Sequence, residues 1–253
     1  MLPALRSLRL SAGMLTALPV GAVLDPSRGV ARGAILLAPL AVAPLGLGVG
    51  LVLWAGGALG VPGLGVAFAA LALLALGTRA LHLDGLSDVA DGLTASYDRE
   101  RSLRVMKGGT AGPAGAATLV IVLGAQAAGL STLVSCDRSD WRDPVLGGLC
   151  VVAARLALWV TCCAVVPPAR PDGLGVTFTR LVPVAVTAVG WVALAAVGAV
   201  LGVRGPITAG VAVVAVVALT WRCVRRFGGV TGDVFGAAIE VALAVLVLGA
   251  ACD

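Results

Sequence analysis

Apolar runs of about twenty residues recur along this chain, and they limit its possible folds more than any other feature. A run of that length forms a helix that crosses the roughly 30 Å hydrocarbon core of a bilayer. Of 253 residues, 59% are hydrophobic and 12% are charged, whereas a soluble domain is about half apolar and a quarter charged. The sequence therefore predicts a single integral membrane domain over residues 1–253 of the all-α class.

We expect a polytopic transmembrane helical bundle with about seven spans. The expected spans are 34–56, 60–79, 113–134, 146–166, 181–202, 206–222 and 234–251. Residues 1–20 are too interrupted for a span, and we expect an interfacial or re-entrant helix there that ends at Pro19. The 35 glycines fit helices that pack closely through small residues.

Basic residues are distributed unevenly between the two sides of this layout. With the N-terminus in the cytosol, the outside loops carry only Arg138, Arg142 and Arg204 of the 18 Lys and Arg residues. This is the positive-inside pattern, and it puts segments 80–112 and 222–233 on the cytosolic side. Because topology accounts for the arginines, the net charge of +5 does not indicate a nucleic-acid partner.

Three aspartates in the segment LHLDGLSDVADGL (81–93) carry the strongest chemical signal. Asp84, Asp88 and Asp91 are spaced i, i+4 and i+7, which places them within roughly 60° of arc on one helical face. Converging carboxylates repel one another unless a cation offsets the repulsion, and hard oxygen ligands favour Mg²⁺ or Mn²⁺. The alternative interpretation is a solvated acidic face on an interfacial helix.

Residues around the aspartates add weaker signals. His82 projects nearly opposite the carboxylates, which favours a hydrogen-bonding role over metal ligation. Gly85 and Gly92 would let backbone or a phosphate approach closely, and we expect the helix to break at Gly92. A basic group follows at Arg99, Arg101, Arg104 and Lys107. These side chains either bind phosphates or only reflect the topology.

Two charged residues, Arg155 and Glu240, fall inside apolar segments. Ionised groups are costly there, so we expect both to face the bundle interior, where they pair or line the site. Glu240 ends the motif GGVTGDVFGAAIE (228–240), in which Thr231 and Asp233 follow a glycine-rich start. Such a start lets a phosphate approach the backbone N–H groups at a helix N-terminus.

Together these motifs resemble the cobalamin 5′-phosphate synthase family, also called adenosylcobinamide-GDP ribazoletransferase. The signature of that family reads approximately HLDGLADTADG, and segments 16–21 (TALPVG), 112–115 (GPAG) and 231–240 (TGDVFGAAIE) also match in order. The resemblance implies a Mg²⁺-dependent enzyme of the bacterial plasma membrane. It would transfer adenosylcobinamide phosphate from adenosylcobinamide-GDP to α-ribazole or its 5′-phosphate and release GMP. Membrane lipid and either a second copy of the chain or other late cobalamin-assembly enzymes would be its partners.

The resemblance also suggests residue roles. Asp84, Asp88 and Asp91 match the acidic motif and are our candidate metal ligands; Asp88, Asp91 and His82 are our candidate catalytic residues. The candidate substrate- and phosphate-binding residues are Gly85, Gly92, Arg101, Arg104, Lys107, Arg155, Thr231, Asp233 and Glu240. The implied reaction is an in-line displacement at the phosphorus joined to cobinamide by the ribose 3′-hydroxyl of ribazole.

The chain departs from the family pattern at one place. Members usually carry an Asp between the Met of the basic segment and the following glycine, but here Met106 is followed by Lys107 and Gly108. Either Asp98 or Asp233 replaces the missing acid, or activity is reduced.

Two other functions stay open at the level of sequence. A CDP-alcohol phosphatidyltransferase-like enzyme shares clustered aspartates, but the G-x3-D-x3-D half of its motif is missing here. A cation transporter would line its pathway with Asp84, Arg155 and Glu240. Acids at the membrane edge rather than at mid-bilayer argue against transport.

Overall fold

The structure is a computed structural model that describes residues 3–24, 26–135, 140–201 and 204–251. Every regular element within these ranges is a helix, so the predicted all-α class is confirmed. The helices are α1 (Pro3–Leu15), α2 (Arg28–Leu36), α3 (Ala38–Ala41), α4 (Ala43–Ala58), α5 (Gly63–Gly77), α6 (Leu81–Ala95), α7 (Arg99–Met106), α8 (Pro113–Thr132), α9 (Arg142–Ala153), η1 (Ala154–Leu156), α10 (Ala157–Thr161), α11 (Leu174–Phe178), α12 (Val184–Leu201), α13 (Gly205–Phe227) and α14 (Gly232–Ala250). Arg138, expected in an outside loop, lies outside the described residues.

Four helical segments of the described chain are long and apolar enough to cross a membrane. They are α8, the α9–α10 segment Arg142–Thr161, α13 and α14. The pair α5 and α6 would count as a fifth span, although the two helices are bent by 92° at their break. A multi-span helical membrane protein is therefore confirmed, whereas the expected count of about seven spans is not.

The first expected span, 34–56, is divided among α2, α3 and α4 because of its prolines. Pro39 and Pro44 lie in the first turns of α3 and α4, where a missing N–H is tolerated, but a proline cannot continue a preceding helix. The N-terminal helix also differs from expectation. It ends at Leu15, before Pro19, and it packs on α2 and α3.

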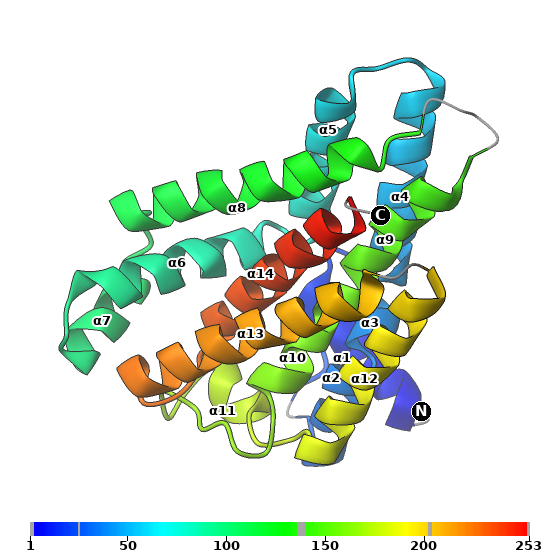
Figure 1. Cartoon of the computed structure of the whole chain (residues 1–253). Helices are drawn as coiled ribbons and strands as arrows, with labels where there is room; N and C mark the ends of the chain where they lie inside the picture. Colours follow the sequence, from blue (N-terminus) through cyan, green and yellow to red (C-terminus); the bar gives the residue numbers. More distant parts are fainter. Residues whose placement is uncertain (1–2, 25, 136–139, 202–203, 252–253) are drawn as a thin grey trace.

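Helix α14 lies at the centre of the bundle. It is apolar on nearly all sides and buried along most of its length, as expected for a helix with no polar face. It packs against α6 and α8 on one side and α13 on the other, and in Figure 1 it runs between them. Its neighbours are thus the helices that carry the sequence motifs.

Helices α6 and α14 cross closely in opposite directions. Gly85 lies against the backbone of Asp233, where an added Cβ would come within 2.6 Å of the Asp233 carbonyl oxygen. A Cβ added at Gly236 would likewise come within 2.9 Å of the His82 Cα. These two glycines therefore allow the acidic motif and the C-terminal motif to meet.

The expected break at Gly92 is wrong, because α6 continues to Ala95. An added Cβ at Gly92 would meet the side chains of Met106 and Phe227. Gly92 therefore allows α7 and α13 to pack closely against α6, and these contacts stabilise the helix at the glycine.

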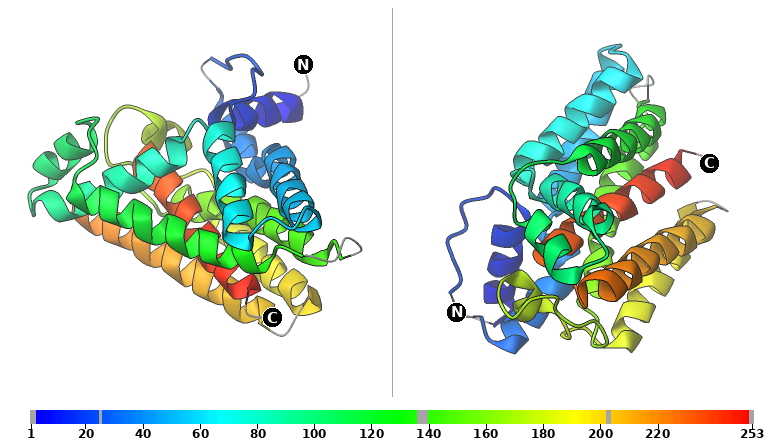
Figure 2. Two further views of the ribbon diagram at one scale, coloured as in Figure 1. Left: turned by 90° about the horizontal axis from the view of Figure 1, so that it is seen from above. Right: turned by 90° about the vertical axis from the view of Figure 1, so that its left-hand side faces the viewer.

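Helix α7 and the segment around α11 lie together at one end of the bundle, which faces the viewer in the right-hand view of Figure 2. The Arg99 Nη2 donates to the Ala169 carbonyl oxygen at 2.7 Å, and the Arg170 Nη2 donates to the Leu103 carbonyl oxygen at 2.6 Å. These bonds fix α7 to the loop that precedes α11.

Candidate active site

The carboxylates of Asp84, Asp88 and Asp233 come together where α6 meets the start of α14. Asp84 and Asp88 are one turn apart on α6, and Gly85 between them touches the Asp233 backbone. Each of the three carboxylates lies within electrostatic reach of the other two. The fold thus joins two motifs separated by more than half of the sequence, and we call these three residues the carboxylate cluster.

Asp88 lies one turn beyond Asp84 on α6, outside the four spanning segments. Burial, followed by the charges of Asp84, Asp233 and Asp91, raises the pKa of the Asp88 carboxyl to about 6. Arg170 acts in the opposite direction. A carboxyl with this pKa can accept and release a proton near neutral pH, as a general base must.

Asp91 is held differently from the other two aspartates of the motif. Its Oδ2 accepts from the Gly112 N–H at 2.6 Å, and its Oδ1 accepts from the Gly115 N–H at 2.9 Å. Gly112 is the N-cap of α8, so the buried carboxylate satisfies backbone donors at a helix start. Both oxygens of Asp91 are engaged by the protein, which explains the GPAG segment 112–115.

A polar pocket of about 210 Å³ adjoins the carboxylate cluster. Its lining includes Lys107, Arg170, Asp172, Thr231 and Asp233. Thr231, the N-cap residue of α14, makes no side-chain hydrogen bond to the helix backbone. Its hydroxyl instead donates to the Asp233 Oδ2 at 3.0 Å. First-turn N–H groups of α14 and two cations therefore border one pocket, a combination that suits a phosphate.

Arg170 was not among the predicted site residues, since in the sequence it resembled any topological arginine. It follows Pro167 and Pro168 in a loop, and only the fold brings it to the carboxylates. Lys107, which directly follows Met106, forms an ion pair with Asp172 at 3.7 Å.

The other basic candidates do not line this pocket. Arg101 and Arg104 are exposed on α7, and Arg104 forms an i, i+4 ion pair with Glu100 at 3.8 Å. Asp98 caps α7 by accepting from the Arg101 N–H at 2.7 Å. Of the two residues proposed to replace the missing acid, only Asp233 therefore belongs to the carboxylate cluster.

His82, Arg155 and Glu240 are buried in the bundle interior rather than in the open pocket. They line a small internal cavity together with Gln126, whose Nε2 donates to the Glu240 Oε2 at 2.8 Å. His82 thus lies opposite the carboxylates, as predicted from its position on the helix. Gln126 was missed because a single amide in an apolar helix carries no motif.

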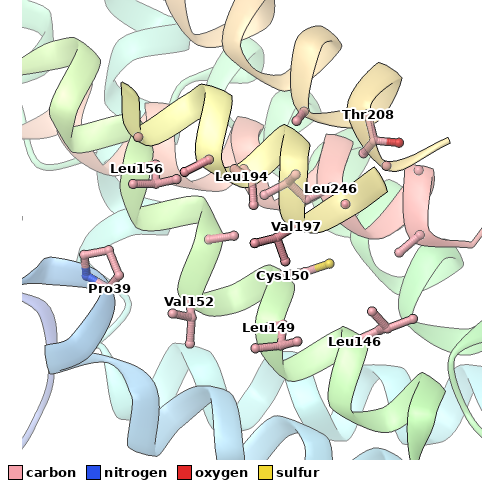
Figure 3. Close-up of a pocket in the computed structure, with 18 residues that line it drawn as sticks. Pro39, Leu146, Leu149, Cys150, Val152, Leu156, Leu194, Val197, Thr208 and Leu246 are labelled. Atoms are coloured by element: carbon pink, nitrogen blue, oxygen red, sulfur yellow. The ribbon is translucent and has the colours of Figure 1, made fainter. Parts of the chain in front are cut away.

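An apolar pocket of about 370 Å³ lies between α9, α12, α13 and α14. The side chains labelled in Figure 3 are apolar except for Cys150 and Thr208. None of its described lining residues is charged, in contrast to the polar pocket beside Asp233.

Comparison with known proteins agrees with this geometry. The family model described as cobalamin-5-phosphate synthase matches residues 7–251. The chain belongs to this family. A Nocardioides relative named adenosylcobinamide-GDP ribazoletransferase is 50% identical over 240 residues, covering 95% of this chain and 96% of the relative. Proteins of the same name from Frankia casuarinae and Bradyrhizobium diazoefficiens are 37% and 34% identical, over 93% and 96% of this chain and 90% and 92% of their own lengths. No solved structure gives a significant match.

Membership of the cobalamin-5-phosphate synthase family also bears on the alternative functions. It favours group transfer over cation transport. The structure agrees, since the cavity that Arg155 and Glu240 line has a volume of only about 10 Å³. The family model and the relatives above are all named for cobalamin synthesis, which favours that activity over CDP-alcohol transfer.

Proposed function

We propose that this protein transfers the adenosylcobinamide-phosphate group from adenosylcobinamide-GDP to α-ribazole or α-ribazole 5′-phosphate. GMP and adenosylcobalamin, or its 5′-phosphate, would be the products. The carboxylate cluster beside the cationic pocket carries this proposal, because it combines metal-binding oxygens with phosphate-binding groups. The names of relatives up to 50% identical support the same reaction.

We further propose that Mg²⁺ binds at this cluster. Among the described residues, no three His, Cys, Asp or Glu side chains form a ready-made metal cage. Mg²⁺ usually keeps several waters and takes one or two carboxylates plus substrate phosphates. Asp233 lines the polar pocket, and Asp84 on the neighbouring helix lies within electrostatic reach of it, so this pair fits that requirement. The oxygens of Asp91 are already engaged by backbone N–H groups. When bound, Mg²⁺ would neutralise charge on the diphosphate during displacement.

The protein's own groups then have distinct roles. The ribazole 3′-hydroxyl oxygen forms a bond to the phosphorus attached to cobinamide, and the bond from that phosphorus to the bridging oxygen breaks. Asp88 accepts the hydroxyl proton, for which a pKa of about 6 suits it. Lys107 and Arg170 bind the departing GMP phosphate together with the first-turn N–H groups of α14.

The orientation in the membrane follows from the same end of the bundle. Helix α7, with its arginines, and the arginines at the end of α13 lie near the carboxylate cluster. We propose that this end faces the cytosol of a bacterial cell across the plasma membrane, in line with the positive-inside pattern. GDP-activated substrates would then reach the site directly.

Purified protein, given both substrates and Mg²⁺, tests the proposal through GMP release. We expect Asp88→Asn to slow release by about 10²-fold or more. The matched control is Asp98→Asn, an exposed carboxylate at the start of α7, which should stay within about twofold of wild type. No GMP release by wild type, or undiminished release by Asp88→Asn, would contradict the mechanism. Turnover of CDP-linked lipid donors instead would favour the phosphatidyltransferase alternative.

A further inference from the structure

The small internal cavity lined by His82, Gln126, Arg155 and Glu240 contains an unusual set of polar atoms. Three side-chain atoms that have no hydrogen-bond partner belong to residues that line it: His82 Nδ1, Gln126 Oε1 and Arg155 Nε. Each of these residues is at most 5% exposed. Glu240, 8% exposed, completes the polar lining. Buried polar groups without partners are rare, so we expect a further hydrogen-bonding group to lie beside these three atoms.

The cavity has the size of one water molecule. It offers about 10 Å³ to the centre of a water-sized sphere, close to the minimum that a single water needs. A buried water also needs two to four polar partners. A water here can accept from the Arg155 Nε–H and the His82 Nδ1–H, and it can donate to the Gln126 Oε1 and to Glu240. All four of its hydrogen-bonding positions are then used.

The direct contacts leave room for such a bridge. His82 Nδ1 and Glu240 Oε1 are 3.7 Å apart, which is too far for a hydrogen bond. The Arg155 Nη1 donates to the Val151 carbonyl oxygen at 2.8 Å, so only part of the guanidinium is satisfied by the protein. A polar contact beyond about 3.5 Å, between groups that line a cavity, is the usual place for a bridging water.

The four side chains come from four different elements. His82 lies on α6, Gln126 on α8, Arg155 on η1 and Glu240 on α14. The Gln126 Nε2 also donates to the Glu240 carbonyl oxygen at 3.1 Å, which ties α8 to the backbone of α14. A cluster of this kind fixes how these elements lie against one another.

That register decides the geometry of the carboxylate cluster. Glu240 is two turns beyond Asp233 on α14, and His82 is two residues before Asp84 on α6. A slip of α6 by one turn would move its aspartates about 5.4 Å along α14. Gly85 contributes no side chain to its contact with Asp233, so side chains elsewhere along the crossing help to fix this register.

We propose that His82, Gln126, Arg155 and Glu240 form a water-bridged polar cluster that sets the register of α6 on α14 and so positions Asp84 and Asp88 opposite Asp233. These four are positioning residues, since none touches the pocket where substrate would bind. Their effect on turnover rests on the proposed function, whereas the register itself does not.

The test compares Gln126→Leu with Leu123→Met. Both positions lie on α8 and line the same cavity, but only the first removes polar atoms. Cryo-electron microscopy maps of wild type should show one water in the cavity, and maps of Gln126→Leu should show α6 displaced along α14. Leu123→Met should keep both the water and the register.

Kinetics provide a second measurement. We expect Gln126→Leu to lower kcat at least tenfold and to raise the Mg²⁺ concentration for half-maximal GMP release, with the KM for α-ribazole unchanged. A merely less stable protein would lose active molecules without changing the Mg²⁺ requirement. If Gln126→Leu fails to fold, Glu240→Gln serves instead, since it keeps the side-chain length and an acceptor for Gln126.

Three results would overturn the inference: no water in the wild-type cavity, an unmoved α6 in a folded variant, or an unchanged Mg²⁺ requirement. Failure of the proposed function looks different. Wild type would then release no GMP, while the water and the displaced helix would still appear in the maps.

Discussion

Asp88→Asn and Asp91→Asn are the same substitution on one helix, less than one turn apart, yet the structure predicts opposite consequences. Asp91 bonds to two backbone N–H groups at the start of α8. Asp88 sits among like charges in the carboxylate cluster. Removing the Asp91 charge should therefore cost stability, and removing the Asp88 charge should cost activity.

The size of the Asp91 effect follows from its two contacts. A hydrogen bond to a charged group contributes about 1.5–3 kcal/mol. An asparagine keeps one acceptor oxygen and turns its NH₂ toward the other backbone N–H, so about one such bond is lost. The attraction between a carboxylate and a helix N-terminus, about 0.3–1 kcal/mol, disappears as well. We expect the free energy of unfolding to fall by roughly 2–4 kcal/mol.

For Asp88→Asn we do not expect the free energy of unfolding to fall. Its pKa is raised to about 6 in the folded protein, so the ionised form is disfavoured there relative to the unfolded chain. At pH 8 the neutral asparagine removes this repulsion, and the unfolding free energy should be unchanged or slightly higher. Because the Asp88 side chain is only partly buried, solvent screening keeps the gain small.

Thermal unfolding in detergent at pH 8, followed together with GMP release, measures both variants. Asp91→Asn should unfold at a clearly lower temperature, and Asp88→Asn should keep its transition while losing turnover. An Asp91→Asn protein as stable as wild type would refute the capping role. A loss of stability in Asp88→Asn as large as in Asp91→Asn would refute the carboxylate cluster as a site of repulsion.

Three further outcomes follow. Arg170→Lys should raise the KM for adenosylcobinamide-GDP about tenfold, since lysine lacks the bidentate fork, whereas Arg101→Lys on the exposed face of α7 should not. The rate of GMP release should fall about tenfold per pH unit below pH 6 as Asp88 protonates, and Asp88→Asn should abolish that dependence. Chelation of Mg²⁺ should stop turnover reversibly, and Asp84→Asn should raise the Mg²⁺ concentration needed to restore it about tenfold or more.

Much of the fold was predictable because the bilayer imposes it. The long apolar runs that became α8, α13 and α14 contain no proline beyond their first turn, and each was expected within a few residues of its observed position. The prediction of one span over 34–56 is wrong, because Pro39 and Pro44 divide this apolar run into separate helices. Hydropathy alone does not distinguish one long helix from several short ones.

The site was predictable where local periodicity governs it and not where tertiary contacts do. Helical spacing correctly placed Asp84 and Asp88 on one face and His82 on the other. The same spacing also predicted that Asp91 belongs with Asp84 and Asp88. Only the tertiary structure shows that both of its oxygens accept from backbone N–H groups at the start of α8. Arg170 could not be found from sequence, because its position depends on the loop before α11 folding back onto α7.

The bend between α5 and α6 shows why the acidic helix depends on the N-terminal segment. Arg79 and Ala80 both adopt the left-handed conformation, with φ of 56° and 54°, which costs a non-glycine residue roughly 1–2 kcal/mol. The Arg79 Nη2 donates to the Gly13 carbonyl oxygen at 3.0 Å, and the Ala17 N–H donates to the Gly77 carbonyl oxygen at 2.7 Å. Helix α1 and the residues after it thus offset the strain of a sharp turn. That turn redirects the chain so that the carboxylates of α6 reach the start of α14. The contact made by Ala17 therefore gives the segment 16–21 (TALPVG) a structural role.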